Sequence, residues 1–388
     1  MKYWRGYLVA GILGLFTWGL MEFAKTHQNL IDMIYPYVTR MIQTALASWS
    51  GGVDFLLWQF LAIVLVVLLL ATIVLMVVLR WNFIQWLGWV AACGSLVFLL
   101  HTGVYGLNQY AGSIAADIQM DVVDYTVTDL KEATLYYRDK ANSLAAQVSR
   151  DASGNPQFPS FEALAEQAGE SFRIMTYEKG QPIFAGSHEP VKQLGWADMY
   201  TSMGITGFHF ALTGEAAVNP QIPVTSLPFT MCHEMAHRAC IASERDANFA
   251  AFLACSTHPN VEFQYSAYFM AYRYCYNALA SVTTSAGAEA AAEVRGGVSD
   301  VLQQDLTAYN NFFAQNKDAQ AEKIGDTVND TYLKVSGNDR GTQSYGDVCD
   351  LLVSWHIQEV ILPQQQETVI PFDPYDKTQV NPPMTEGN

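Results

Sequence analysis

Three long stretches in the amino-terminal part of the chain are almost purely apolar, and more polar segments separate them. They cover about residues 7–21, 55–79 and 83–100. A helix rises about 1.5 Å per residue and the hydrocarbon core of a bilayer is about 30 Å thick, so helices of roughly this length can cross it. We therefore predict three transmembrane helices. The first stays on the chain as an uncleaved anchor, because no small-residue cleavage site follows it.

The pattern changes near residue 107. Apolar residues then recur every three or four positions, which is typical of helices that bury one face. One short stretch, Gly207–Asn219, has strand character instead, with a turn near Thr213 and Gly214. Residues 172–205 are rich in glycine and proline and predict loops. Helices are predicted over about 111–151, 160–169, 247–253, 261–281, 288–316, 319–334 and 345–359.

The fold class that follows from these patterns is mainly α. A membrane domain over residues 1–107 carries the three spans, and a mostly helical domain with a small β element covers residues 108–362. Residues 363–388 are rich in proline and glutamine and predict an extended tail.

Composition supports two unlike parts. The chain is 51% hydrophobic and only 15% charged, which is too apolar for an ordinary soluble protein. Residues 1–107 have five cationic and three anionic side chains, a net charge of +2, so the remaining residues carry −18 of the total of −16. A strongly negative domain is repelled by nucleic acid, and the sequence has no basic patch with aromatic residues. Both features argue against nucleic-acid binding.

The positive charges near the spans predict the topology. Lys2 and Arg5 precede the first span, and Arg80 lies in the short turn between the second and the third. Cytoplasmic segments are enriched in such residues, so the amino terminus is expected inside and residues 108–388 outside the cytoplasmic membrane. Residues 26–53 then form an outer loop with amphipathic helical pieces, which we expect to lie on the membrane surface.

The candidate chemistry lies within Leu227–Phe249, which contains a His-Glu-x-x-His motif. His233 and His237 are four residues apart, so on a helix they share a face and both rings can reach one ion at about 2.1 Å. Glu234 lies beside that ion, where it can accept a proton from an activated water. The motif predicts a zinc site with His233 and His237 as ligands and Glu234 as the catalytic base.

Glu244 is the candidate third ligand, because a catalytic zinc takes three protein ligands and keeps one open position. In one continuous helix Glu244 would lie about 10 Å along the axis from His237, too far to share an ion. The chain must therefore turn within residues 238–243, where Cys240 occupies the position at which a glycine would be expected. Ser243 would then cap a second helix. Asn248, one turn after Glu244, could hold a histidine ligand through its other ring nitrogen.

Other polar residues leave alternatives open. Asp246 and Glu262 are reserve ligands, and His209 is expected to be a packing residue. No single residue is assigned as the donor that would stabilise a tetrahedral intermediate. The candidates for that role are Tyr265, Tyr268, Arg273, Tyr345 and His356.

Several segments together resemble the bacterial membrane-protein family known as domain of unknown function 3810. That family is similar to zincin peptidases of the glutamate-ligand kind. The resemblance implies a zincin-like outer domain with His233 and His237 as ligands, Glu244 as third ligand and Glu234 as base. The matching segments are Tyr105–Asn108, Gly207–Asn219, Leu227–His237, Glu244–Cys255, Tyr265–Tyr268 and Ser344–Gly346.

These features predict a membrane-anchored zinc endopeptidase that hydrolyses peptide bonds with a metal-activated water, near the outer membrane surface. The alternative is a non-catalytic zinc-binding sensor or assembly factor that acts with a membrane partner. A non-haem iron site of two histidines and one carboxylate is a further alternative, although Glu234 favours hydrolysis. An intramembrane protease is disfavoured, because residues 228–250 are too polar to span lipid.

Overall fold

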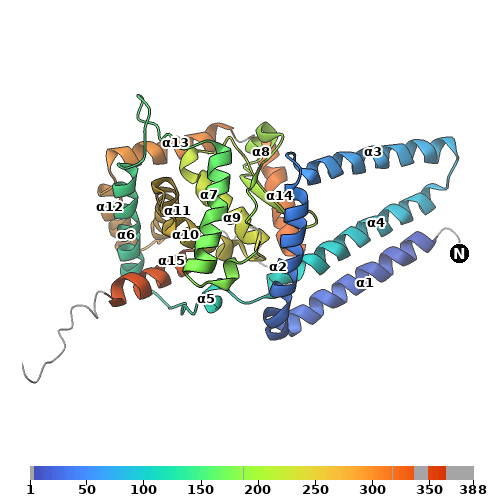
Figure 1. Ribbon diagram of the computed structural model, residues 1–388, viewed down its shortest axis with the longest axis horizontal. Coiled ribbons are helices and arrows are strands. Elements are labelled where there is room, and N and C mark those ends of the chain that lie inside the picture. The colour runs from blue at the N-terminus through green and yellow to red at the C-terminus, as the bar shows by residue number, and fades with distance from the viewer. Residues whose placement is uncertain (1–3, 187, 317, 336–347, 364–388) are drawn as a thin grey trace, which may run out of the picture.

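The amino-terminal part consists of four long helices in a computed structural model that describes residues 4–363 except 187, 317 and 336–347. Three of them are long and apolar enough to cross a membrane, and they cover the three apolar stretches in which spans were predicted. In Figure 1 these three project together from one side of the structure, and the fourth, α2, runs across their ends. The helices are α1 (Arg5–Thr26), α2 (Gln28–Gly51), α3 (Leu57–Val78) and α4 (Phe83–Val104), and the three candidate spans are α1, α3 and α4.

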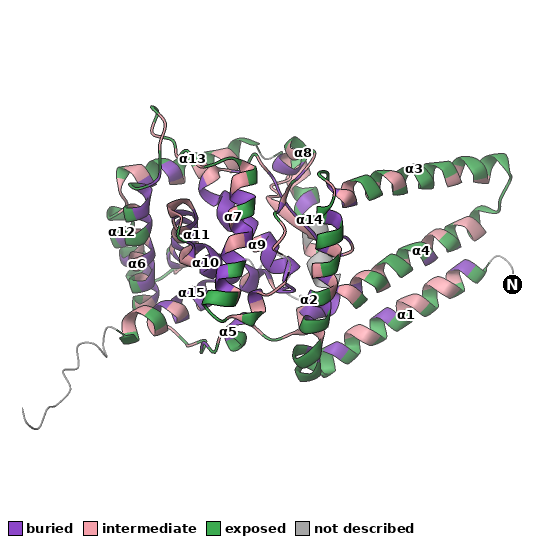
Figure 2. Ribbon diagram, in the orientation of Figure 1, coloured by how far each residue is buried: buried purple, intermediate pink, exposed green. Residues whose placement is uncertain are grey.

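The α1 and α4 helices pack closely because a glycine from each lies at their contact. A Cβ atom added at Gly6 would lie 2.4 Å from the carbonyl carbon of Gly88, so only glycine allows this approach. The α3 helix has no buried residue in its apolar stretch, and most of its residues are exposed (Figure 2).

The rest of the described chain is mainly helical, as predicted. Most helices begin at a side chain that accepts a backbone N–H. Thr126 and Asp129 form a capping box at α6, and Ser160 and Thr284 cap α7 and α12. The helices are α5 (Ile114–Asp117), α6 (Val127–Ala145), α7 (Phe161–Arg173), α8 (Ala197–Ser202), α9 (Leu227–Arg238), α10 (Glu244–Thr257), α11 (Val261–Ala280), α12 (Ser285–Gly296), α13 (Asp300–Asn316), α14 (Ala319–Val335) and α15 (Val348–His356).

A small sheet of three strands lies beside α9. Its strand order is β1 (Lys192–Gln193), β3 (Glu215–Val218) and β2 (Gly207–Phe210), with β1 parallel and β2 antiparallel to the central β3. The β2–β3 hairpin was predicted, and Gly214 turns its loop with a φ of +67°. The pattern did not predict β1, which lies inside the segment expected to be loops.

The centre of the domain is built around α9 and α10. Every residue of α9 except His233 is buried, and most of α10 is buried as well (Figure 2). Helices α7 and α11 pack against both members of this pair, and α6 packs against α11. The His-Glu-x-x-His motif therefore lies in the core and not on a surface loop.

Two predicted helices differ from the structure. The helix expected over 111–151 is interrupted at residues 118–126, because the capping box at Thr126 starts a new helix there. The helix expected over 288–316 ends at Gly296, and Ser299 accepts the N–H of Leu302 at the start of α13. The extended tail predicted for 363–388 lies almost wholly outside the described residues.

Candidate metal centre

The two histidines of the motif lie on one face of α9. The helix begins with a proline in its first turn, where the missing N–H costs no hydrogen bond, and the N–H of Phe229 bonds to Ser266 Oγ of α11 at 3.1 Å. One turn separates His233 from His237, and their Nε2 atoms are 3.1 Å apart. The helix thus aims both rings at the same point.

A sharp turn reverses the chain directly after α9, as the sequence required. Cys240 adopts the left-handed conformation with a φ of +70°. Its N–H bonds to the His237 carbonyl at 2.9 Å, and the N–H of Ile241 bonds to the Ala236 carbonyl at 3.0 Å. These two bonds define a Schellman motif, which usually has glycine at the left-handed position. Ser243 then caps α10 by accepting the N–H of Asp246 at 3.5 Å.

Glu244, the first residue of α10, faces the two histidines as a result of this turn. Its Oε2 lies 3.2 Å from His233 Nε2, and its Oε1 lies 3.6 Å from His237 Nε2. Four ligands at about 2.1 Å around a tetrahedral zinc are about 3.4 Å from one another. The three distances of 3.1, 3.2 and 3.6 Å are close to that value, so the donor atoms are spaced to share one ion.

Hydrogen bonding supports this interpretation. The Nδ1 of His237 lies 2.9 Å from the Ile241 carbonyl, so Nδ1 carries the proton and Nε2 presents a lone pair to the cluster. Two imidazole nitrogens 3.1 Å apart repel each other unless a proton or a cation lies between them. Glu244 Oε2 is buried and lacks a hydrogen-bond partner in the described part of the chain. Two imidazoles and one carboxylate are also the donor set of many catalytic zinc sites.

Glu234 lies next to the cluster and is held from one side by β2. Its side chain packs against Gly207, where an added Cβ would lie 2.5 Å from Glu234 Oε1. Burial raises the pKa of Glu234 to about 7, although His233 and His237 act to lower it. A carboxyl group with this pKa can both accept and release a proton near neutral pH.

Asn248 forms no hydrogen bond with either histidine in the described part of the chain, and its Nδ2 has no partner there. Its Oδ1 accepts a hydrogen bond from the hydroxyl of Tyr274 at 3.2 Å. The Ile241 carbonyl holds His237 in the way expected of Asn248, because the turn brings that carbonyl beneath the ring. Tyr274 was not identified from the sequence. It lies two turns after Ser266 on α11, on the face that contacts α9 and α10.

The other candidates that the structure describes are not among the converging donor atoms. Asp246 accepts hydrogen bonds from Ser113 and from the N–H of Ile114, and is not one of the converging donors. Tyr265 donates a hydrogen bond to Asp305, and Arg273 stacks on the ring of Tyr309. Tyr268 and His356 both pack against Tyr136. Glu262 lies in the first turn of α11, and Tyr345 is outside the described residues.

The family model for protein of unknown function (DUF3810) matches residues 32–353. The chain belongs to this family. The match includes α9, α10, the sheet and the last two of the candidate spans. No curated protein and no solved structure matches the chain.

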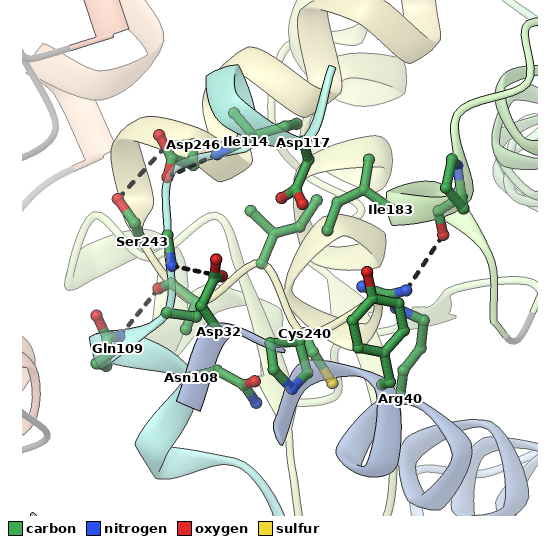
Figure 3. A pocket seen from close by; sticks show the side chains of 17 residues that line it. Asp32, Arg40, Asn108, Gln109, Ile114, Asp117, Ile183, Cys240, Ser243 and Asp246 are labelled. Carbon is green, nitrogen blue, oxygen red and sulfur yellow. Dashed lines mark hydrogen bonds between the residues drawn. The ribbon is translucent and has the colours of Figure 1, made fainter. Parts of the chain in front are cut away.

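In this DUF3810 protein a cavity of about 120 Å³ lies beside the turn between α9 and α10 (Figure 3). It is lined by α2, by α5 and the segment before it, by Pro182 and Ile183, and by residues 240–243 with Asp246. Arg40 of α2 reaches along its wall and donates to the carbonyl oxygens of Ala239 at 3.0 Å and Pro182 at 3.1 Å. Because Ala239 lies between α9 and Cys240, α2 directly supports the turn that aims Glu244.

Proposed function

We propose that the protein is a membrane-anchored zinc endopeptidase of the zincin type, with its catalytic domain outside the cytoplasmic membrane. The observation that carries this proposal is the convergence of His233, His237 and Glu244 beside Glu234. Among the described residues, three would coordinate a zinc ion. The fourth coordination position would then be open to water or substrate. A purely structural zinc takes four protein ligands, so the ligand count favours catalysis over the sensor or assembly role.

The three proposed ligands and Glu234 would have different roles in the hydrolysis. A zinc ion held by the three ligands would act as a Lewis acid and make water a stronger nucleophile at neutral pH. Glu234 accepts the proton of the attacking water on a carboxylate oxygen, holds it, and transfers it to the amine that leaves. Its raised pKa suits both transfers. The buried surroundings of Glu234 strengthen its electrostatic interaction with the reacting atoms.

The edge of β2 supports a polypeptide substrate. Residues that face each other across two antiparallel strands alternate between hydrogen-bonded pairs and pairs without hydrogen bonds, and in the latter the main-chain N–H and C=O groups point away from the partner strand. The N–H of Asn219 bonds to the Thr206 carbonyl, so the alternation directs the main-chain groups of Gly207 and His209 away from β3. An extended peptide can pair with such an edge. Since Gly207 touches Glu234, a paired peptide would run past the catalytic base.

A substitution of the base tests the proposal. Glu234→Gln keeps the size of the side chain and removes its ability to accept a proton, so hydrolysis of a fluorogenic peptide mixture should fall by a factor of about 10² to 10⁴. Zinc content and thermal stability should remain those of the wild type. Glu262→Gln on α11, outside the cluster, is the matched control and should retain full activity. Equal rates for Glu234→Gln and wild type at equal zinc content would disprove the mechanism.

A further inference from the structure

The α2 helix has two unlike faces and lies where the membrane helices meet the rest of the protein. It runs across the ends of α1, α3 and α4 (Figure 1). Its 24 residues span about 36 Å at about 1.5 Å per residue. Asp32 and Arg40 are its only charged residues.

The inner face of α2 is covered by the domain that holds the metal centre. Arg40 donates to the Ala239 carbonyl at the end of α9. Gln43 donates to the carbonyl of Ala211, in the loop of the β2–β3 hairpin, at 2.9 Å. This face therefore contacts both structures that frame the candidate site. Its buried residues are Ile31, Pro36, Thr39, Arg40, Gln43, Ala47 and Ser50.

The outer face is an exposed apolar stripe. Its side chains follow the spacing i, i+3, i+4, i+7, i+8 and i+11, which places them along one side of a helix. Their exposed fractions run from 40% to 75%. A contiguous apolar surface of this kind marks a place of contact, since exposing it to water is unfavourable. The stripe consists of Leu30, Met33, Ile34, Tyr37, Val38 and Met41.

Continuity with the membrane spans identifies what covers the stripe. His27 alone separates α2 from α1, and only residues 52–56 separate it from α3. Both neighbours are of membrane-spanning length, so the ends of α2 lie at the boundary of the bilayer. A helix that crosses the spans at this boundary lies in the plane of the membrane, with its apolar side among the lipids. Tyr37 and Trp49 are also of the aromatic types enriched at that depth.

We propose that the outer face of α2 is embedded in the interfacial layer of the lipid bilayer, while its inner face holds the turn of the metal centre at the membrane surface. The nearly uncharged helix binds by apolar insertion, so neutral lipid suffices. The thickness of one helix, about 10 Å, then separates the turn from the lipid. This proposal concerns the lipid contact and does not depend on peptidase activity.

Site-directed labelling tests the proposal. Cys93, the exposed cysteine, is replaced by serine, and the other five cysteines are buried and will not react in the folded protein. Single cysteines are then introduced as Met33→Cys and Met41→Cys on the stripe. Ala308→Cys, on an exposed position of α13, is the control. Each full-length variant is labelled with a small fluorophore and reconstituted in phosphatidylcholine nanodiscs, with a brominated lipid or aqueous iodide as quencher.

The proposal predicts that brominated lipid quenches the labels at positions 33 and 41 several-fold more strongly than iodide does, and that the label at 308 shows the opposite preference. Stripe labels quenched by iodide in the same way as the control would place the face in water and overturn the proposal. Stripe labels shielded from both quenchers would show that protein covers the face, which also overturns it. Two separate stripe positions guard against a local effect of either substitution.

Discussion

Replacing Gly207 with alanine should displace Glu234, the proposed catalytic base, without touching the three proposed metal ligands. The added methyl group would lie 2.5 Å from Oε1, 2.8 Å from Cγ and 2.9 Å from Cδ of Glu234, whereas ordinary contacts begin at 3.4 Å. The Glu234 carboxylate or the strand must therefore move by about 0.9 Å. A misplacement of about 1 Å in a catalytic group can lower the rate about 10²-fold, equivalent to about 2.7 kcal/mol of transition-state stabilisation.

The assay compares kcat/KM for a fluorogenic peptide with zinc content and thermal unfolding, all measured in nanodiscs. Gly207→Ala should lose about 10²-fold in kcat/KM and keep its zinc. Overpacking should lower the free energy of unfolding by about 1–3 kcal/mol. Gly296→Ala is the matched control, because an added Cβ there meets no atom within 4 Å. Wild-type kcat/KM in Gly207→Ala would refute the inferred contact between β2 and the base.

Three further predictions test the turn, its support and the ionisation of the cluster. Cys240→Val places a β-branched residue at a φ of +70°. It should lower the affinity for zinc, and it should lower the free energy of unfolding by about 2 kcal/mol. A denaturation curve like that of the wild type would contradict this. Arg40→Met leaves the Ala239 carbonyl without its donor and should cost about 1–3 kcal/mol, so an unchanged Tm in nanodiscs would argue against the support from α2. In protein stripped of metal, burial opposes the charge on His237, but Glu244 outweighs it and raises the pKa of His237 to about 9. The stability gained from the His237–Glu244 pair is present below the pKa of His237 in the unfolded chain, about 6.5, and is lost as the pH rises through 9. The Tm of the metal-free protein should therefore fall over this pH range. The Tm of metal-free Glu244→Gln should fall much less.

The membrane helices and the motif could be predicted from the sequence because their signals are local. Long apolar runs identify α1, α3 and α4 without knowledge of the rest of the fold. The spacing of His233 and His237 fixes their common face once the segment is a helix. The turn before Glu244 could be required on geometric grounds, and the structure contains it.

Features that depend on tertiary contacts could not be predicted. The β1 strand has two residues and exists because β3 offers it a parallel partner. The partner of His237 is the main-chain carbonyl of Ile241, and no side-chain pattern reports where a carbonyl will point. Tyr274 approaches Asn248 only because α11 packs on α10.

Cys240 adopts the left-handed backbone conformation although glycine is usually preferred there, because tertiary contacts stabilise the turn. Glycine adopts this conformation most readily, but here two backbone hydrogen bonds close the turn and Arg40 holds the preceding carbonyl. The thiol is also buried beside Tyr105 and Ala242, and that packing favours a side chain over glycine.

The zinc content of the purified full-length protein tests the central claim most directly. After incubation with zinc and removal of the excess, mass spectrometry of the intact protein should find one zinc ion per wild-type chain. His233→Ala should lose it, while Glu262→Gln should keep it. Folded wild-type protein that retains no zinc, or a His233→Ala variant that binds zinc as the wild type does, would contradict the account.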